Sequence, residues 1–341
     1  MSDYQQPLLI DRIESSGLRR IAVVGLHEAA GARTVVESLA AESVARGRTP
    51  GVTRSPREVA EGHQVPARLR LPEDVVIATR AESSPEGWSY SRTTEEGSIP
   101  LHGPDESGVM REVLDELARL CDGPALVDGC WERRGFIGPR VSQGLVLAVG
   151  AGYSRTPELS AKAARFAVEI LRARASSANA ALTWRDASTR DVYVLLDRDG
   201  RPYSEVPSRV KDPTARILQI DGGPPATLVL PGGLNDELLA PLVRSGLRCN
   251  LVVQDPTRIN VAPVYHRAWH KGGGRIEVVE SLNLIAVATN PIRDEGDDAD
   301  PEAFRAQVAE QLPDLAVHDV RLEARPTEDR GWRFWRRRRS G

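Results

Sequence analysis

The sequence predicts an α/β protein with a mostly parallel sheet, helices on both faces of that sheet, and a second, smaller α/β domain. Two observations carry this prediction. Short apolar runs rich in β-branched residues alternate with segments of helical periodicity from residue 18 onward. The same alternation returns after residue 226. Strands that are separated by helices form parallel sheets, and such sheets are covered on both faces.

In the first half of the chain, strands are expected at residues 20–25, 50–54, 74–79, 124–129 and 144–151. Helical patterns run from Val35 to Gly47, over residues 108–120 and over residues 156–174. The last of these has Thr156 as its N-cap and a proline at its first helical position. The polar segment 80–107 is interpreted as turn-rich, with a small hairpin.

The second half contains a hairpin, residues 191–206, whose turn is the Asp199-Gly200 pair. After it we expect strands at residues 227–230, 250–254, 275–279 and 284–289, and helices at 236–245, 263–271 and 301–312. The expected organisation is an irregular arm (1–17), a first domain (18–180), a connection with the hairpin (181–225), a C-terminal α/β domain (226–322) and a basic-aromatic tail (323–341).

Composition excludes several classes of function. Hydrophobic residues make up 40% of the chain and charged residues 27%, as in globular proteins. The net charge of −3 gives the main body no electrostatic attraction to nucleic acid. No apolar run is long enough for a membrane helix. Three cysteines, none in a CxxC pair, favour a reducing compartment, so we expect a soluble cytoplasmic protein. The tail, Trp332–Arg339, is interpreted as solvated, with an acidic partner, a lipid headgroup or RNA as alternatives.

The strand at residues 20–25 ends in a loop of small residues that precedes a helix. This is the layout in which backbone N–H groups and a helix N-terminus bind phosphate. A P-loop places lysine directly after its second glycine and Ser or Thr after that lysine. With Gly25 and Gly31 as the two glycines, those positions hold Ala32 and Arg33, and Thr34 comes one residue late. The chain therefore has a degenerate P-loop (Walker A) and a sheet expected to be P-loop NTPase-like.

This loop predicts a residual phosphate site in which ATP or another nucleotide binds with Mg²⁺. Gly25 and Gly31 would give the backbone room to approach, Arg33 would supply charge and Thr34 a hydroxyl group. Nucleotide hydrolysis is in doubt, because the lysine that holds the β- and γ-phosphates is missing. The alternative is a tight turn that kept its glycines for packing. Glu28 would repel phosphate if its side chain pointed into the loop.

A second marker is the apolar run that ends at Asp128-Gly129. A carboxylate at the end of a strand beside a P-loop holds magnesium, directly or through water. Asp128 is therefore the candidate Mg²⁺ residue, and an ordinary Asp-Gly turn is the alternative.

Two further polar groups lie in the second half. His266 and His270 are four residues apart on a predicted helix and share a face, but no third ligand accompanies them, so we interpret them as surface histidines. Asp255 follows a strand and is expected to start a turn, although ligands also collect at such strand ends.

Several segments together resemble a known family, the P-loop-bearing subunit of the lysine 5,6-aminomutase reactivase. They are residues 20–34 (GLxxxAGxxT), 74–79 (DVVIAT), 126–129 (LVDG), 148–154 (AVGAGYS), 283–291 (NLIAVATNP) and, as a further element, 255–259 (DPTRI). Their order spans most of the chain. More distantly, the first domain resembles dethiobiotin synthetase and related P-loop proteins, whose GTDxxxGKT loop has the same glycine spacing.

The resemblance implies an accessory factor that restores an adenosylcobalamin- and pyridoxal-phosphate-dependent aminomutase whose cobalamin is damaged. The implied partners are the aminomutase and the second reactivase subunit, a MutS-like ATPase. Nucleotide turnover would be weak or absent in this chain. Two alternatives stay open: an ATP-dependent ligase or amidase of the dethiobiotin-synthetase type, and a non-catalytic scaffold that binds protein.

Overall fold

The computed structural model describes residues 7–27, 30–56, 67–80, 87–154, 156–293 and 298–323. Glu28 and the Trp332–Arg339 tail lie outside them. The chain divides into two compact units. The larger consists of Met1–Arg165 and Leu284–Gly341, and the smaller of Phe166–Asn283. Both combine helices with mostly parallel strands, so the predicted α/β class is confirmed at this level.

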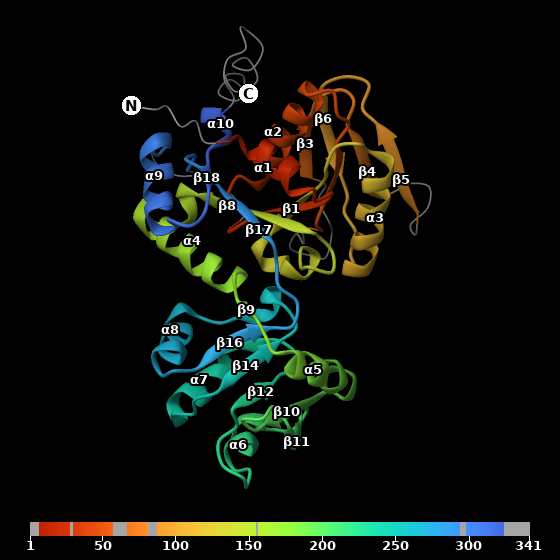
Figure 1. Cartoon of the computed structure of the whole chain (residues 1–341). Coiled ribbons are helices and arrows are strands. Elements are labelled where there is room, and N and C mark those ends of the chain that lie inside the picture. Colours follow the sequence, from red (N-terminus) through yellow and green to blue (C-terminus); the bar gives the residue numbers. More distant parts are fainter. Residues whose placement is uncertain are drawn as a thin grey trace. The chain divides into compact units, whose positions relative to one another are not determined.

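Within the described residues, eight strands of the larger unit form one sheet in the order β18-β17-β8-β1-β7-β2-β4-β5 (Figure 1). Neighbouring strands are parallel except β4 and β5. The strands are β1 (Arg20–Gly25), β2 (Gly51–Arg54), β4 (Val76–Arg80), β5 (Trp88–Arg92), β7 (Ala125–Cys130), β8 (Gly144–Gly150), β17 (Leu284–Asn290) and β18 (Val317–His318). Separately, β3 (Ala67–Leu71) and β6 (Gly97–Leu101) form an antiparallel pair.

Helices cover both faces of this sheet. They are α1 (Leu9–Ser16), α2 (Ala32–Ala45), α3 (Ser107–Leu120), the first part of α4 (Pro157–Leu171), α9 (Pro301–Gln311) and α10 (Val320–Glu323), with 3-10 turns η1 (Trp131–Phe136) and η2 (Ala151–Tyr153). Val52 belongs to the core under α2, whereas Gly51 lies beneath Leu117 of α3. Because successive residues of a strand point to opposite faces, α2 and α3 lie on opposite faces of the sheet.

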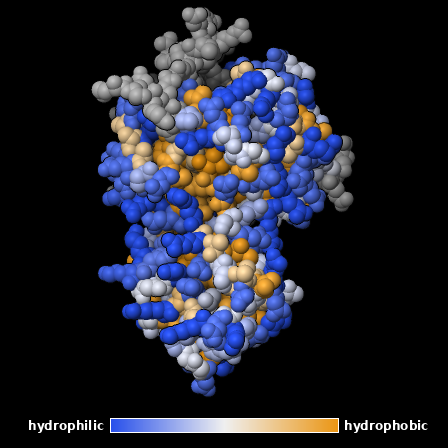
Figure 2. All heavy atoms as spheres, viewed as in Figure 1, coloured by the Kyte–Doolittle hydropathy of each residue, from blue (hydrophilic) through white to orange (hydrophobic). Residues whose placement is uncertain are grey.

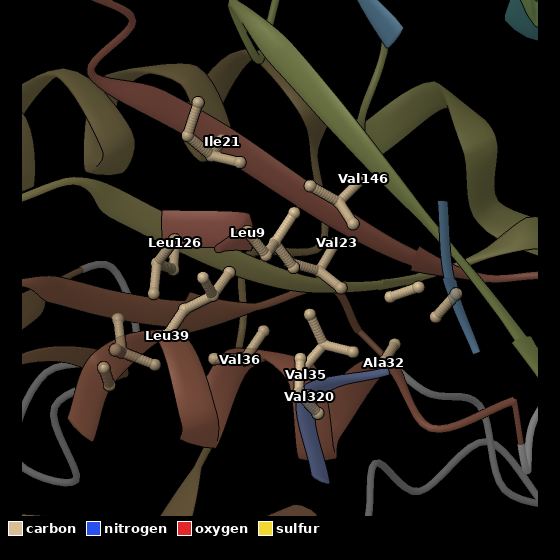
Figure 3. Close-up of a cluster of buried hydrophobic side chains, with 14 of the residues drawn as sticks. Leu9, Ile21, Val23, Ala32, Val35, Val36, Leu39, Leu126, Val146 and Val320 are labelled. Atoms are coloured by element: carbon tan, nitrogen blue, oxygen red, sulfur yellow. The ribbon is translucent and has the colours of Figure 1, made fainter. Parts of the chain in front are cut away.

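The core under α2 consists of apolar side chains from the helix and the central strands (Figure 3). Val36 and Leu39 of α2 pack with Ile21 and Val23 of β1 and with Leu126 of β7. These side chains are at most 1% exposed. Burial of this kind contributes roughly 1.5–3 kcal/mol per large side chain, so the start of α2 is held firmly above β1.

In the described part of the smaller unit, six strands form a sheet in the order β11-β10-β12-β14-β16-β9. The strands from β12 to β9 are parallel, and β10 is antiparallel to both of its neighbours. The elements are β9 (Arg174–Ala175), β10 (Val192–Leu196), β11 (Pro202–Pro207), β12 (Thr227–Val229), β14 (Asn250–Val253), β16 (Arg275–Val278), α5 (Ala178–Arg190), α6 (Pro213–Leu218), α7 (Asp236–Ser245), η3 (Pro256–Arg258), α8 (Pro263–Lys271) and the short pair β13 (Leu234–Asn235) and β15 (Ile259–Asn260).

The structure differs from the expected organisation in three places. Residues 9–16, expected as part of an irregular arm, form α1, because Leu9, Ile10 and Ile13 bury one helical face in the core. The hairpin expected in a connecting segment is the edge of the second sheet. Residues 284–323, expected in the C-terminal domain, return to the larger unit, because β17 pairs with β8. An apolar run predicts a strand but does not identify the sheet that it joins.

None of the described helices has the length and apolar character needed to cross a membrane.

In the view of Figure 2, hydrophilic residues surround a group of hydrophobic ones on the larger unit, over the region where Figure 1 shows β8 and β17. All residues of β8 are buried, as are the last five of β17, so these strands form part of the apolar interior.

Candidate functional site

The topology of the larger sheet singles out the carboxyl end of β1. From β1 the chain passes through α2 to β2, which lies beyond β7 on one side of β1. From β7 it crosses to β8, which lies on the other side. The direction of winding therefore changes at β1. In open parallel sheets ligands bind outside the carboxyl ends of the strands at such a switch point.

The loop from β1 to α2 is fixed at both ends by backbone hydrogen bonds. The Leu26 N–H donates to the Ala148 carbonyl of β8 over 2.9 Å, and the Ala30 N–H donates to the His27 carbonyl over 3.1 Å. Gly31 precedes α2 at a φ of 90°, a left-handed conformation that favours glycine. The first helical hydrogen bond runs from the Val35 N–H to the Gly31 carbonyl. The preceding N–H groups of the first turn have no intrahelical acceptor, as at any helix start.

The residues predicted for the phosphate site take different positions on this first turn. Ala32 and Thr34 are buried, with 7% and 6% of their surface exposed, whereas Arg33 is half-buried. The N-cap residue of α2 is Gly31, which has no side chain that could cap the helix. The positive end of the helix dipole and the backbone N–H groups at Ala32, Arg33 and Thr34 are therefore the chemistry that this loop offers to an anion.

Asp128 lies on β7, next to β1, where it pairs in register with Val23 on one side and Arg54 on the other. Asp128 lies two residues after Leu126 on the strand, so the two side chains point to the same face. Leu126 is in the core under α2, and Asp128 is therefore on the α2 face of the sheet. Asp128 is 7% exposed, and its backbone carbonyl accepts hydrogen bonds from the N–H and hydroxyl of Ser55. The structure thus places Gly25 and Asp128 near the carboxyl ends of two neighbouring strands.

Sequence reasoning missed two residues near the carboxyl ends of these strands. Asn290, the last residue of β17, is 8% exposed and lies against Gly31. Its Oδ1 accepts a hydrogen bond of 2.8 Å from Nη2 of Arg321, on α10. The only sequence signal for Asn290 is the Asn-Pro pair that ends an apolar strand. Arg321 has no such signal, because only the return of the chain to this sheet brings it near.

The polar residues predicted in the smaller unit do not form a metal site. His266 and His270 share a face of α8, as expected, with ring centroids 4.5 Å apart. The surface interpretation was wrong for His266, which is 8% exposed and packs edge-on against Phe166. Burial, and then the neighbouring His270, lower the pKa of His266 to about 4. The described residues contain no cluster of three or more His, Cys, Asp or Glu suited to a metal.

Two aspartates of the smaller unit, Asp255 and Asp197, hold turns, and the second of them also lines a cavity. Asp255 starts a turn, as predicted: its Oδ1 accepts hydrogen bonds from the N–H and hydroxyl of Thr257. A cavity of about 480 Å³ lies beside the β10–β11 turn and is lined by Asp197, Tyr203 and Arg248, among others. Asp197 accepts the N–H groups of Asp199 and Arg201, and so holds this turn.

Comparison with known proteins does not identify a family. No family model, no curated protein and no solved structure matches the chain. The assignment of a function therefore depends on the geometry at the carboxyl end of β1.

Proposed function

We propose that this chain binds a nucleoside polyphosphate, with Mg²⁺, at the loop between β1 and α2. The observation that carries this proposal is the arrangement of β1, α2 and β7. A glycine-containing loop leads from a central parallel strand into a helix whose N-cap is a glycine, and the buried carboxylate of Asp128 lies two residues before the end of the adjacent strand. Helix N–H groups would bind the phosphates and Asp128 would hold the metal ion.

The strand order supports a P-loop NTPase-like fold for the larger unit. β1 is central, the strand that carries Asp128 is its direct neighbour, and β8 and β17 follow on the other side. This order places the switch point at the end of β1, where the degenerate P-loop begins. With Ala32 in the position of the lysine, we expect binding to exceed hydrolysis by far.

In the cell, this site would serve an accessory factor for an adenosylcobalamin- and pyridoxal-phosphate-dependent aminomutase. The support is that five of the six segments which resemble the reactivase family include strands of one sheet, while residues 255–259 lie in the smaller unit. β1, β4, β7, β8 and β17 all belong to the larger sheet, and four of them end near the proposed site. The proposed partners are the aminomutase and a MutS-like second subunit.

Calorimetric titration with ATP and ADP, each with and without Mg²⁺, tests the nucleotide proposal. We expect micromolar affinity that Mg²⁺ strengthens. No heat with any of these ligands would refute nucleotide binding and leave a non-catalytic scaffold as the better account. Co-elution of the chain with a purified lysine 5,6-aminomutase and its MutS-like partner tests the accessory role. Separate elution of all three, with and without Mg-ATP, would contradict that role.

A further inference from the structure

The short helix α10 is held beside the first turn of α2. β18 pairs with β17, and α10 follows directly. Val320, its first residue, is 2% exposed and belongs to the same core cluster as Ala32 and Val35 (Figure 3). The last described segment of the chain is thus anchored at the start of the helix that follows the degenerate P-loop.

Polar contacts fix the orientation of α10. Oδ1 of Asp319 accepts the Arg321 N–H over 3.0 Å and the Leu322 N–H over 3.4 Å. The Thr289 hydroxyl donates to the His318 carbonyl over 3.1 Å. Asp319 and Thr289 are 1% and 3% exposed. The hydrogen bond between Thr289 and His318 is fully buried and therefore costly to break, so it anchors the residues that lead into α10.

The guanidinium of Arg321 is hydrogen-bonded to Asn290, the residue that lies against Gly31. Nη2 of Arg321 donates to Oδ1 of Asn290, and the Asn290 side chain in turn lies against Gly31. A Cβ atom on Gly31 would lie 2.7 Å from Cβ of Asn290, so only a glycine permits this contact. Arg321, Asn290 and Gly31 therefore form a series from α10 to the N-terminus of α2.

We infer that Arg321 is the cation that binds the phosphate groups at this loop, in place of the lysine that is missing at Ala32. The inference rests on the proposed nucleotide site and adds a residue to it. An arginine offers five N–H donors in a planar fork, which matches phosphate oxygens in a bidentate way. Asn290 would hold that fork in place before the ligand arrives, so little side-chain entropy is lost on binding.

The test compares Arg321→Gln, Arg321→Lys and Arg33→Gln with the unaltered full chain. Arg111→Gln is the matched control, because Arg111 is an exposed arginine of α3, on the opposite face of the sheet. The ligands are Mg-ATP, Mg-ADP and pyrophosphate, which reports on phosphate alone. Thermal unfolding of each variant verifies that it is folded.

We expect Arg321→Gln to weaken ATP and pyrophosphate binding by roughly 10- to 100-fold, as for the loss of charge-assisted hydrogen bonds. Arg321→Lys should lose less, and Arg111→Gln nothing. Equal affinity of Arg321→Gln and the unaltered chain would overturn the role of Arg321 while the nucleotide site stands. A tenfold loss in Arg33→Gln alone would also overturn it, in favour of Arg33. Failure of the unaltered chain to bind any of the three ligands would overturn both proposals.

Discussion

The side chain of Asn290 lies directly against Gly31, although the two residues belong to opposite ends of the chain. Gly31 has a φ of 90°, and a Cβ atom on it would come within 2.7 Å of Cβ and 2.9 Å of Cγ of Asn290. This contact joins the end of β17 to the start of α2. Through it, the segment that returns to the larger unit contacts the loop between β1 and α2.

Gly31→Ala should therefore destabilise the protein by about 1–3 kcal/mol. The alanine would be strained at the left-handed φ of this position, and its Cβ atom would clash with the Asn290 side chain. Urea unfolding measures this change. Gly108→Ala is the control: Gly108 lies within α3 with nothing near its Cβ position, so this substitution should be neutral or stabilise by up to about 1 kcal/mol. Equal stability of Gly31→Ala and the unaltered protein would contradict the described contact.

Glu42 should make stability fall as the pH rises. Burial, and then the charge of Glu323, raise its pKa to about 7, against the opposing effects of Arg46 and Ser38. The folded state therefore holds a proton that the unfolded state releases near pH 4.5. The stabilisation is complete below pH 4.5 and is lost as the pH approaches 7.

Glu42→Gln should match the unaltered protein at pH 4.5 and exceed its stability at pH 8 by on the order of 2 kcal/mol. Denaturant unfolding at the two pH values measures the difference. Glu112→Gln, on the exposed side of α3, serves as a control and should change neither value. An unchanged pH profile in Glu42→Gln would contradict the raised pKa.

The lowered pKa of His266 should make the stability of the smaller unit depend on pH in the opposite direction. Its pKa of about 4 lies below the ordinary 6.5, chiefly because it is buried, and also because His270 lies beside it, while Glu169 acts in the opposite direction. The folded state thus disfavours the charged imidazole, and stability is lost as the pH falls from 6.5 toward 4. In His266→Gln this loss should shrink by on the order of 2 kcal/mol, as measured by unfolding at pH 7 and pH 4.5. If the stability of His266→Gln falls between pH 7 and pH 4.5 as much as that of the unaltered protein, the lowered pKa of His266 is contradicted.

The two titrating groups show what sequence could and could not predict. The runs that became β1, β7 and β8, and the helix α2, were recognisable because β-branched residues and helical periodicity are local signals. The burial of His266 was not, because it depends on Phe166, from another helix. The fully buried His318, its contact with Glu323 and the nearby Glu42 come together only through tertiary packing.

The site shows the same division. Gly25, Gly31 and Asp128 follow from local motifs, and the topology brings the strands that carry them to adjacent positions. Asn290 and Arg321 could not be assigned, since nothing in a single apolar strand indicates that it rejoins the first sheet. Only the pairing of β17 with β8 carries α10 to the start of α2.

Asp128→Asn should remove the contribution of Mg²⁺ to nucleotide binding. If Asp128 holds the metal ion, the variant should bind Mg-ATP at least about fivefold more weakly, and ATP in EDTA with unchanged affinity. Calorimetry in the two buffers separates these effects. Asp314→Asn, at an exposed aspartate before β18, is the control and should behave as the unaltered chain does. Equal losses with and without Mg²⁺ would contradict a metal role.

The most direct measurement is the change in backbone amide NMR signals of the full chain when Mg-ATP is added. The account predicts the largest shifts at Gly31, Ala32, Arg33 and Thr34, because their N–H groups would donate to phosphate oxygens. Unchanged signals at these four amides, whether or not signals elsewhere move, would contradict a phosphate site at the start of α2.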